Sequence, residues 1–283
     1  MTFASLLVPI DYGPDADRAL CVAGHIAAQA GLPVELITVT DPRLDPEDDQ
    51  AEMLRRAEEL RPVPCTVSIV REDDVGAALT RALVDRPDAL PVIGTAAART
   101  LAEMLDPGVW PAALHATGRP ALVVGPKVVE GVVRLDRLVV AVTASTQPRC
   151  LAQAACTWAD TFDATVSVVD VVGEGGLAKG EAQYTLREVS LALRRNDLPA
   201  AISVVHADDL ADALRDLSRR SPAILAITTG HWTGTDRVHR SLARDVVRSA
   251  NVPILLVPTN GRLSVEPGTG PARGASRPSG SPR

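Results

Sequence analysis

The chain repeats itself at a spacing of about 132 residues. LLVPID at 6–11 aligns with LVVAVT at 138–143, and GLPVELITV at 31–39 aligns with DATVSVVDV at 163–171. The segments 64–79 and 199–214 also align, with seven of sixteen positions identical, and RPALVVGP at 119–126 aligns with VPILLVPT at 252–259. These matches in the same order indicate a duplicated domain of about 130 residues, because the period is far too long for a solenoid repeat.

Within each copy, short runs of Val, Ile and Leu alternate with helical patterns, and the runs predict five strands per copy. The expected strands are 5–11, 34–39, 65–70, 90–94 and 121–125 in copy one, and 137–143, 165–171, 200–205, 223–228 and 253–258 in copy two. Strands that are apolar throughout are buried on both faces. We therefore expect an α/β protein made of two tandem, doubly wound parallel-sheet domains with right-handed crossovers.

The repeat also sets the domain boundaries. We expect one domain at 1–126 and a second at 137–259, joined by a linker at 127–136. The remaining 24 residues, 260–283, contain five Gly, four Pro and four Ser, a composition that predicts a disordered tail.

Helix ends are marked by familiar residues. Pro14 and Pro148 predict the first turns of the first helix in each copy, and Gly31 predicts the end of the first of these helices. Acidic pairs recur at 73–74 and 208–209, where each pair opens the third helix of its copy. We interpret them as caps that meet the positive end of the helix dipole, in preference to paired catalytic carboxylates.

Composition and charge argue against several classes of partner. Seven residues are aromatic, too few for the stacking platforms of single-strand nucleic-acid binders, and the formal net charge of -6 gives no general attraction to phosphate backbones or anionic membranes. The sequence has no basic, apolar leader and no run of 18 apolar residues. We expect a cytoplasmic protein with reduced cysteines that binds neither nucleic acid nor membrane.

The sequence shows no catalytic or metal-binding signature. It has no G-x-S-x-G elbow and no H-E-x-x-H, and its five histidines show no metal-ligand spacing. GEGGLAKGE at 173–181 is similar to a dinucleotide-binding loop, but it follows the second strand of its copy, and the counterpart in copy one has no glycine. We therefore expect no catalytic residue and no metal site.

In an open α/β sheet, ligands bind at the carboxyl ends of the strands, where the strand order reverses. In this order of connection the crevice lies between the first and fourth strands. Strand one ends at Asp11, whose carboxylate can accept hydrogen bonds from an adenine amino group or a ribose hydroxyl, or can simply cap the helix that follows. Strand four ends at Gly94, and a second turn follows at Pro107 and Gly108, where phosphates can approach backbone N–H groups.

Together these features resemble a tandem universal stress protein. Each copy has the family's opening strand and helix, a loop after strand four, and a closing strand, GRPALVVGP in copy one and NVPILLVP in copy two. The resemblance covers about 1–126 and 137–259. It implies a Rossmann-like fold of the adenine nucleotide alpha-hydrolase type, a non-catalytic role in the stress response, and packing of the copies as an intramolecular pseudo-dimer through their last strands. Further homo-oligomerisation is left open.

Nucleotide-binding members of the family carry an Asp after strand one and a loop of pattern G, two residues, G, nine residues, G, then Ser or Thr. In copy one Asp11 and Gly94 match, while the later positions hold Ala97, Pro107 and Gly108. Ala97 and Pro107 add bulk where phosphate oxygens would approach, Pro107 removes an N–H donor, and Gly108 removes a hydroxyl.

Copy two retains a different part of the pattern. Thr143 stands at the Asp position and Arg240 at the third glycine, whereas Gly230 and Ser241 match the second glycine and the Ser/Thr position. Gly230 and Ser241 are therefore the candidate binding residues of copy two.

The resemblance implies ATP or another adenine nucleotide as ligand, bound in copy one. The candidate binding residues there are Pro9, Asp11, Val39, Gly94, Ala97, Arg99, Gly108 and Val109. Two alternatives stay open: a degenerate scaffold that binds proteins and no nucleotide, and a slow ATP hydrolase on the same fold. The second is disfavoured because no activated nucleophile or oriented general base can be assembled from the sequence.

Overall fold

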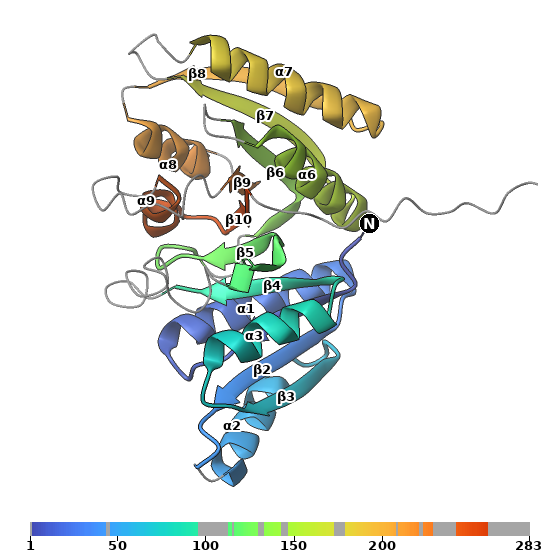
Figure 1. Ribbon diagram of the computed structural model, residues 1–283, viewed down its shortest axis with the longest axis vertical. Helices are drawn as coiled ribbons and strands as arrows, with labels where there is room; N and C mark the ends of the chain where they lie inside the picture. The colour runs from blue at the N-terminus through green and yellow to red at the C-terminus, as the bar shows by residue number, and fades with distance from the viewer. Residues whose placement is uncertain are drawn as a thin grey trace, which may run out of the picture.

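Figure 1 shows the computed structural model, which describes residues 2–43, 46–95, 113–114, 116–129, 133–142, 147–172, 179–207, 209–220, 223–228 and 242–259. The first half contains β1 (Ser5–Pro9), α1 (Pro14–Ala30), β2 (Val34–Thr40), α2 (Pro46–Glu59), β3 (Cys65–Arg71), α3 (Val75–Asp85), β4 (Ala89–Gly94) and β5 (Ala121–Val124). The second half contains β6 (Arg134–Val142), α6 (Pro148–Phe162), β7 (Thr165–Val172), α7 (Lys179–Arg195), β8 (Ala200–His206), α8 (Leu210–Arg220), β9 (Ala223–Thr228), α9 (Leu242–Ser249) and β10 (Ile254–Val257).

The ten strands that the structure describes form one sheet, in the order β3-β2-β1-β4-β5-β10-β9-β6-β7-β8. Neighbouring strands are parallel within each half. The halves meet through β5 and β10, which pair antiparallel with Leu122 opposite Leu255. The predicted α/β fold with five parallel strands per copy is confirmed, and the two half-sheets are continuous with each other.

The strand bounds differ from the prediction at two informative places. β1 ends at Pro9, two residues early, and the chain turns at Tyr12, whose φ of 59° is left-handed. β6 begins at Arg134, inside the segment expected to be linker, because Arg134 pairs with Ala223 before the register shifts toward Leu138.

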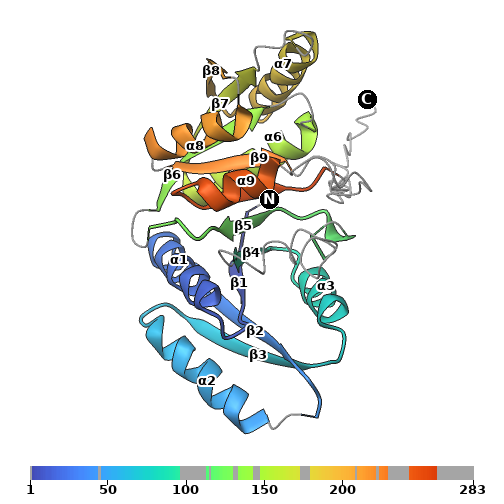
Figure 2. The same ribbon diagram turned by 90° about the vertical axis from the view of Figure 1, so that its left-hand side faces the viewer.

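Helices cover both faces of the sheet (Figure 2). Alternate residues of a strand point to opposite faces, so Leu6 and Val8 of β1 lie in one buried cluster and Leu7 in another. The face with Leu6 and Val8 is covered by α1, α2, α6 and α7. The other face is covered by α3 in the first half and by α8 and α9 in the second.

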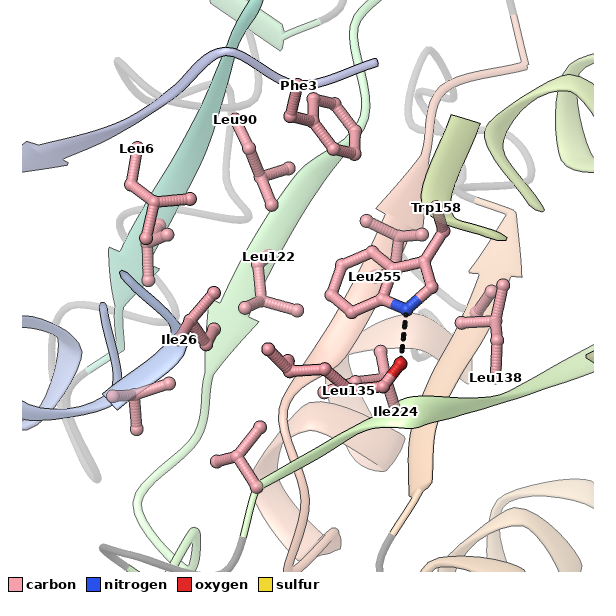
Figure 3. Close-up of a cluster of buried hydrophobic side chains, with 14 of the residues drawn as sticks. Phe3, Leu6, Ile26, Leu90, Leu122, Leu135, Leu138, Trp158, Ile224 and Leu255 are labelled. Atoms are coloured by element: carbon pink, nitrogen blue, oxygen red, sulfur yellow. Dashed lines mark hydrogen bonds between the residues drawn. The ribbon is translucent and has the colours of Figure 1, made fainter. Parts of the chain in front are cut away.

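The largest buried cluster crosses from one half into the other (Figure 3). Trp158 of α6 is fully buried, and its indole N–H donates to the carbonyl of Leu135 at 3.2 Å. The Trp158 ring packs on Phe162 with centroids 4.4 Å apart, and Phe162 in turn lies 6.4 Å from Phe3 of the first half. The halves therefore share a core as well as a sheet.

The predicted helix ends are confirmed. α1 begins at Pro14, and Gly31 ends it with a φ of 67° while its N–H donates to the carbonyl of Ala27. Asp74 caps α3 by accepting a hydrogen bond from the N–H of Ala77 at 2.9 Å. In the second half, Asp209 accepts hydrogen bonds from two N–H groups in the first turn of α8.

None of the four cysteines forms a disulfide. In the described ranges, no helix has the length and apolar character needed to cross a membrane.

Gly94 at the end of β4 lies directly under the first turn of α1. A Cβ atom there would lie 1.9 Å from the carbonyl oxygen of Asp15, far inside van der Waals contact. The sequence suggested a glycine that lets a ligand approach, whereas the structure shows that helix packing by itself already requires one.

Replacing Gly94 with Ala is expected to destabilise the protein by at least about 2 kcal/mol, because backbone atoms of α1 must move. Gly24 in the middle of α1 is the matched control, since a Cβ there meets only the flexible end of Leu60, at 2.7 Å. Gly24→Ala should change stability by less than about 1 kcal/mol, because the gain in helix propensity offsets the contact. Urea unfolding of both variants tests this, and equal effects would contradict it.

Candidate functional site

A cavity of about 290 Å³ lies at the carboxyl ends of β1, β2 and β4. The strand order of the first half reverses between β1 and β4, so the cavity occupies the predicted crevice. Its walls are mainly apolar and are formed by Ile37, Val39, Val75, Leu79 and Ile93. A mainly apolar pocket with a few polar groups is typical of small-molecule sites.

The structure brings four of the predicted binding residues to this cavity: Pro9, Asp11, Val39 and Gly94. The other six, Ala97, Arg99, Gly108, Val109, Gly230 and Ser241, lie outside the described residues. That any of the ten contacts a nucleotide stays a prediction.

The sequence left open whether Asp11 caps the following helix. In the structure Asp11 is not the cap residue itself, but it holds the turn just before the helix. Its Oδ1 accepts a hydrogen bond from the N–H of Gly13 at 3.0 Å, which closes a short turn before α1. Gly13 is the N-cap residue of α1. The Oδ2 atom takes no part in that hydrogen bond, and the Asp11 side chain is exposed at the cavity. One carboxylate can therefore hold the turn and accept a hydrogen bond from a ligand.

Tyr12 is a cavity residue that the sequence analysis missed. It is 38% exposed and has a left-handed backbone, which is uncommon outside glycine. Burial raises the pKa of its phenol; a hydrogen bond with Thr38 lowers it, and Asp49 raises it. Tyr12 thus presents a protonated hydroxyl and an aromatic ring at the mouth of the cavity. Its place beside Asp11, in a chain with only two tyrosines, was the available signal.

A buried arginine holds this corner of the site together. Arg56 of α2 is 4% exposed, donates to Glu52 at 2.8 Å and also donates to Asp17 in the first turn of α1. Its guanidinium carbon lies 5.7 Å from the centroid of the Tyr12 ring. Hydrogen bonds from Arg55 and Arg56 lower the pKa of Glu52 to about 2. Arg56 therefore links α2, α1 and the tyrosine at the mouth of the cavity.

Thr38 supplies a polar group at the floor of the cavity. It is 2% exposed, and its Oγ1 donates to the carbonyl of Ile10 at 2.9 Å, across the β1–β2 pair. The described end of the cavity therefore offers a carboxylate, a phenol and a hydroxyl between apolar walls.

Charge at this end of the cavity disfavours an anion. Ala16 in the first turn of α1 lines the cavity, and a helix N-terminus attracts negative charge. In that first turn Arg18 pairs with Asp15 at 2.7 Å and Arg56 pairs with Asp17. Among the described residues no cation pairs with Asp11, so its carboxylate leaves a negative charge at the cavity. The described residues thus suit the uncharged, hydrogen-bond-donating part of a ligand better than a phosphate group.

No family model matches the chain, and no curated protein matches it either. Solved structures do match. A universal stress protein from Archaeoglobus fulgidus DSM 4304 is 15% identical, with a TM-score of 0.58 over 90% of this chain and 96% of that chain. A putative universal stress protein from Pseudomonas aeruginosa UCBPP-PA14 is 14% identical, with a TM-score of 0.56 over 91% and 94%.

The chain has the universal stress protein fold. The same architecture also occurs in the cytoplasmic domain of a prokaryotic cation chloride cotransporter, which is 12% identical, with a TM-score of 0.51 over 91% of this chain and 96% of that chain. At such identities the likeness shows the fold alone. What the universal stress protein fold does in this chain has to be inferred from its own residues.

The two halves of this universal stress protein fold carry different polar residues at a buried position of their second strands. The repeat aligns Asp170 of β7 with Thr38 of β2. Asp170 is 2% exposed, and within the described part of the chain its Oδ1 has no hydrogen-bond partner. Burial raises the pKa of the Asp170 carboxyl, and His206 on β8 opposes that rise. The sequence analysis missed Asp170 because a single acid in an otherwise apolar strand gave no recognised pattern.

The raised pKa of Asp170 predicts a pH-dependent stability. The folded protein holds this proton more tightly than the unfolded chain does, so the contribution of Asp170 to stability is fully present below the unfolded-state pKa of about 4 and is lost as the pH rises through the folded-state pKa. Asp170→Asn removes the titration. The free energy of unfolding of the variant relative to wild type should therefore grow between pH 4 and pH 7 in urea titrations. A pH-independent difference would contradict this assignment.

Proposed function

We propose that the protein is a non-catalytic regulatory protein that binds an adenine nucleotide in the cavity of its first half. The observation that carries this is the convergence of Asp11, Tyr12 and Thr38 on an apolar cavity at the point where the strand order reverses. The volume of about 290 Å³ is at the lower limit of ordinary ligand pockets and matches a nucleoside better than a whole triphosphate.

In this proposal the adenine ring lies between the apolar walls formed by Val39, Leu79 and Ile93. Asp11 accepts a hydrogen bond from the amino group or from a ribose hydroxyl, and the backbone of Val39 contacts the base. The phosphates extend past Gly94 toward 95–109, where Ala97, Pro107 and Gly108 provide fewer donors and less space than the family pattern. Affinity therefore comes mainly from the nucleoside, so AMP and ATP bind with similar strength.

The polar groups that line the cavity are held by hydrogen bonds to backbone atoms or to each other. Groups fixed in this way suit a protein that orients a ligand without catalysing a reaction on it. The stress-response role follows from the family resemblance and the cytoplasmic location from the sequence analysis, and both are proposed here.

Asp11→Ala tests the site directly by titration calorimetry with AMP and ATP. Wild type should bind both nucleotides with dissociation constants within about threefold of each other, and Asp11→Ala should weaken both by at least about tenfold, the value of a hydrogen bond to a charged group. Asp160→Ala, on the exposed side of α6, is the matched control and should bind like wild type.

Two results would contradict the proposal. Absence of binding by wild type at about 1 mM nucleotide, an affinity weaker than about 4 kcal/mol, would favour the protein-binding scaffold. Steady release of phosphate from ATP that Asp11→Ala abolishes would favour the hydrolase.

Variants of Tyr12 test AMP binding separately from the stability of the fold. Tyr12→Gly relieves the left-handed backbone but removes the ring beside Arg56, so the free energy of unfolding should change by less than about 1 kcal/mol. AMP binding should weaken several-fold because the aromatic ring at the mouth of the cavity is lost. Tyr12→Phe keeps the ring and should retain most of the affinity. If Tyr12→Gly bound AMP like wild type, Tyr12 would lie outside the site.

A further inference from the structure

The two edges of the ten-stranded sheet are covered to different degrees. The edge strands are β3 and β8, which the repeat makes equivalent (Figure 1). In β3, Val67 packs against the largest buried cluster, and Ile69 is partly buried. The equivalent residues of β8, Ile202 and Val204, are 47% and 51% exposed. The edge strand of the second half therefore exposes apolar side chains that the first half covers.

β8 also lacks the features with which soluble proteins block an open sheet edge, which are charged side chains, proline and bulges. Its sequence is AAISVVH, with no Asp, Glu, Lys, Arg or Pro, whereas β3 ends in Arg71. Among the described strands β7 is its one neighbour, and the two pair over seven consecutive positions without a bulge. A regular, apolar edge strand of this kind is a template for pairing with another strand.

The sequence of β8 is complementary to itself in an antiparallel pair. With Ser203 on a twofold axis, Ile202 of each copy lies opposite Val204 of the other, and all seven residues of β8 are paired. Directly opposite residues lie on the same face of a sheet. The exposed Ile202 and Val204 side chains of both copies then form one cluster, so pairing covers the apolar surface that a single chain exposes.

Helix α8 adds charge complementarity to this arrangement. A cavity of about 440 Å³ lies between α8 and β8, lined by Val205 and His206 from the strand side and by Asp209, Asp212 and Arg220 from the helix side. The two acids lie at the start of α8, and Arg220 lies in its last turn. A twofold axis makes the two α8 helices antiparallel. The acidic start of one helix then lies at the same end of the interface as the basic end of the other.

We propose that two copies of this chain associate through β8, which pairs antiparallel with β8 of the second copy about Ser203. The partner is a second copy because both the apolar pattern of the strand and the charges of α8 match themselves under twofold symmetry. The association continues the sheet from one chain into the next, by the same kind of pairing that joins β5 to β10 within the chain. It does not depend on nucleotide binding.

Sedimentation equilibrium of the full-length protein tests the proposal, with Val204→Lys as the disrupting variant. Wild type should sediment at twice the chain mass at micromolar concentration. Val204→Lys should weaken dimerisation at least about tenfold, because a lysine on an edge strand opposes pairing and the twofold symmetry applies the change twice. Val84→Lys is the matched control, since Val84 is an apolar residue of α3 that is 62% exposed, and it should dimerise like wild type.

Cysteine cross-linking tests the register. In the proposed pair the two Ser203→Cys thiols face each other, with Cβ atoms about 4.5 to 5.5 Å apart. Mild oxidation should therefore give a disulfide-linked dimer, above the background that the four native cysteines give in wild type. Ala201→Cys, two residues earlier on the same strand, is the control. Its two copies lie about 13 Å apart, too far for a disulfide, so this variant should stay at the background.

A wild-type protein that sediments at the chain mass at micromolar concentration would overturn the proposal. So would a Val204→Lys protein that dimerises as tightly as Val84→Lys. Equal cross-linking through positions 201 and 203 would overturn the pairing about Ser203.

Discussion

The pairing of β5 with β10 is the interaction on which the rest of the structure depends. Both strands, ALVV at 121–124 and ILLV at 254–257, are uncharged and buried throughout. If the halves separated, each would expose an apolar strand edge, a feature that soluble proteins avoid. Pairing covers both edges, joins two half-sheets into one, and lets the buried cluster around Trp158 extend across the junction. Each half therefore covers the apolar strand edge of the other.

This pairing also determines where ligands can bind. Because β5 and β10 are antiparallel while each half is parallel within itself, the carboxyl ends of the two sets of strands lie at opposite edges of the sheet. The crevice at the carboxyl ends of β1 and β4 is therefore formed by residues of the first half. In the first half those residues are fixed from several directions, by α1 packed on Gly94 and by Arg56 between α1, α2 and Tyr12.

The sequence predicted the parts of this architecture that depend on local pattern. Apolar runs located all ten strands, proline and glycine located the ends of α1, and the order of connection located the crevice that contains Asp11 and Gly94. The resemblance to universal stress proteins implied the strands at which the halves meet.

The features that the sequence did not reveal depend on contacts between distant residues. Arg56 and Asp17 are far apart in the chain, and nothing in the α2 pattern distinguishes the arginine that becomes buried from its exposed neighbour Arg55. The left-handed turn at Tyr12 and the Asp170 oxygen that has no partner among the described residues are likewise set by the folded chain and not by a local pattern. Gly94 was identified for a reason that concerned ligands, and the structure supplies a second reason in the carbonyl of Asp15.

A crystal structure of the full-length protein grown with AMP tests the central claim most directly. The account predicts electron density for adenine between Val39 and Ile93, with a base or ribose donor about 3 Å from Asp11 Oδ2. Density for AMP at another place, or a cavity that contains only water in the presence of saturating AMP, would contradict it.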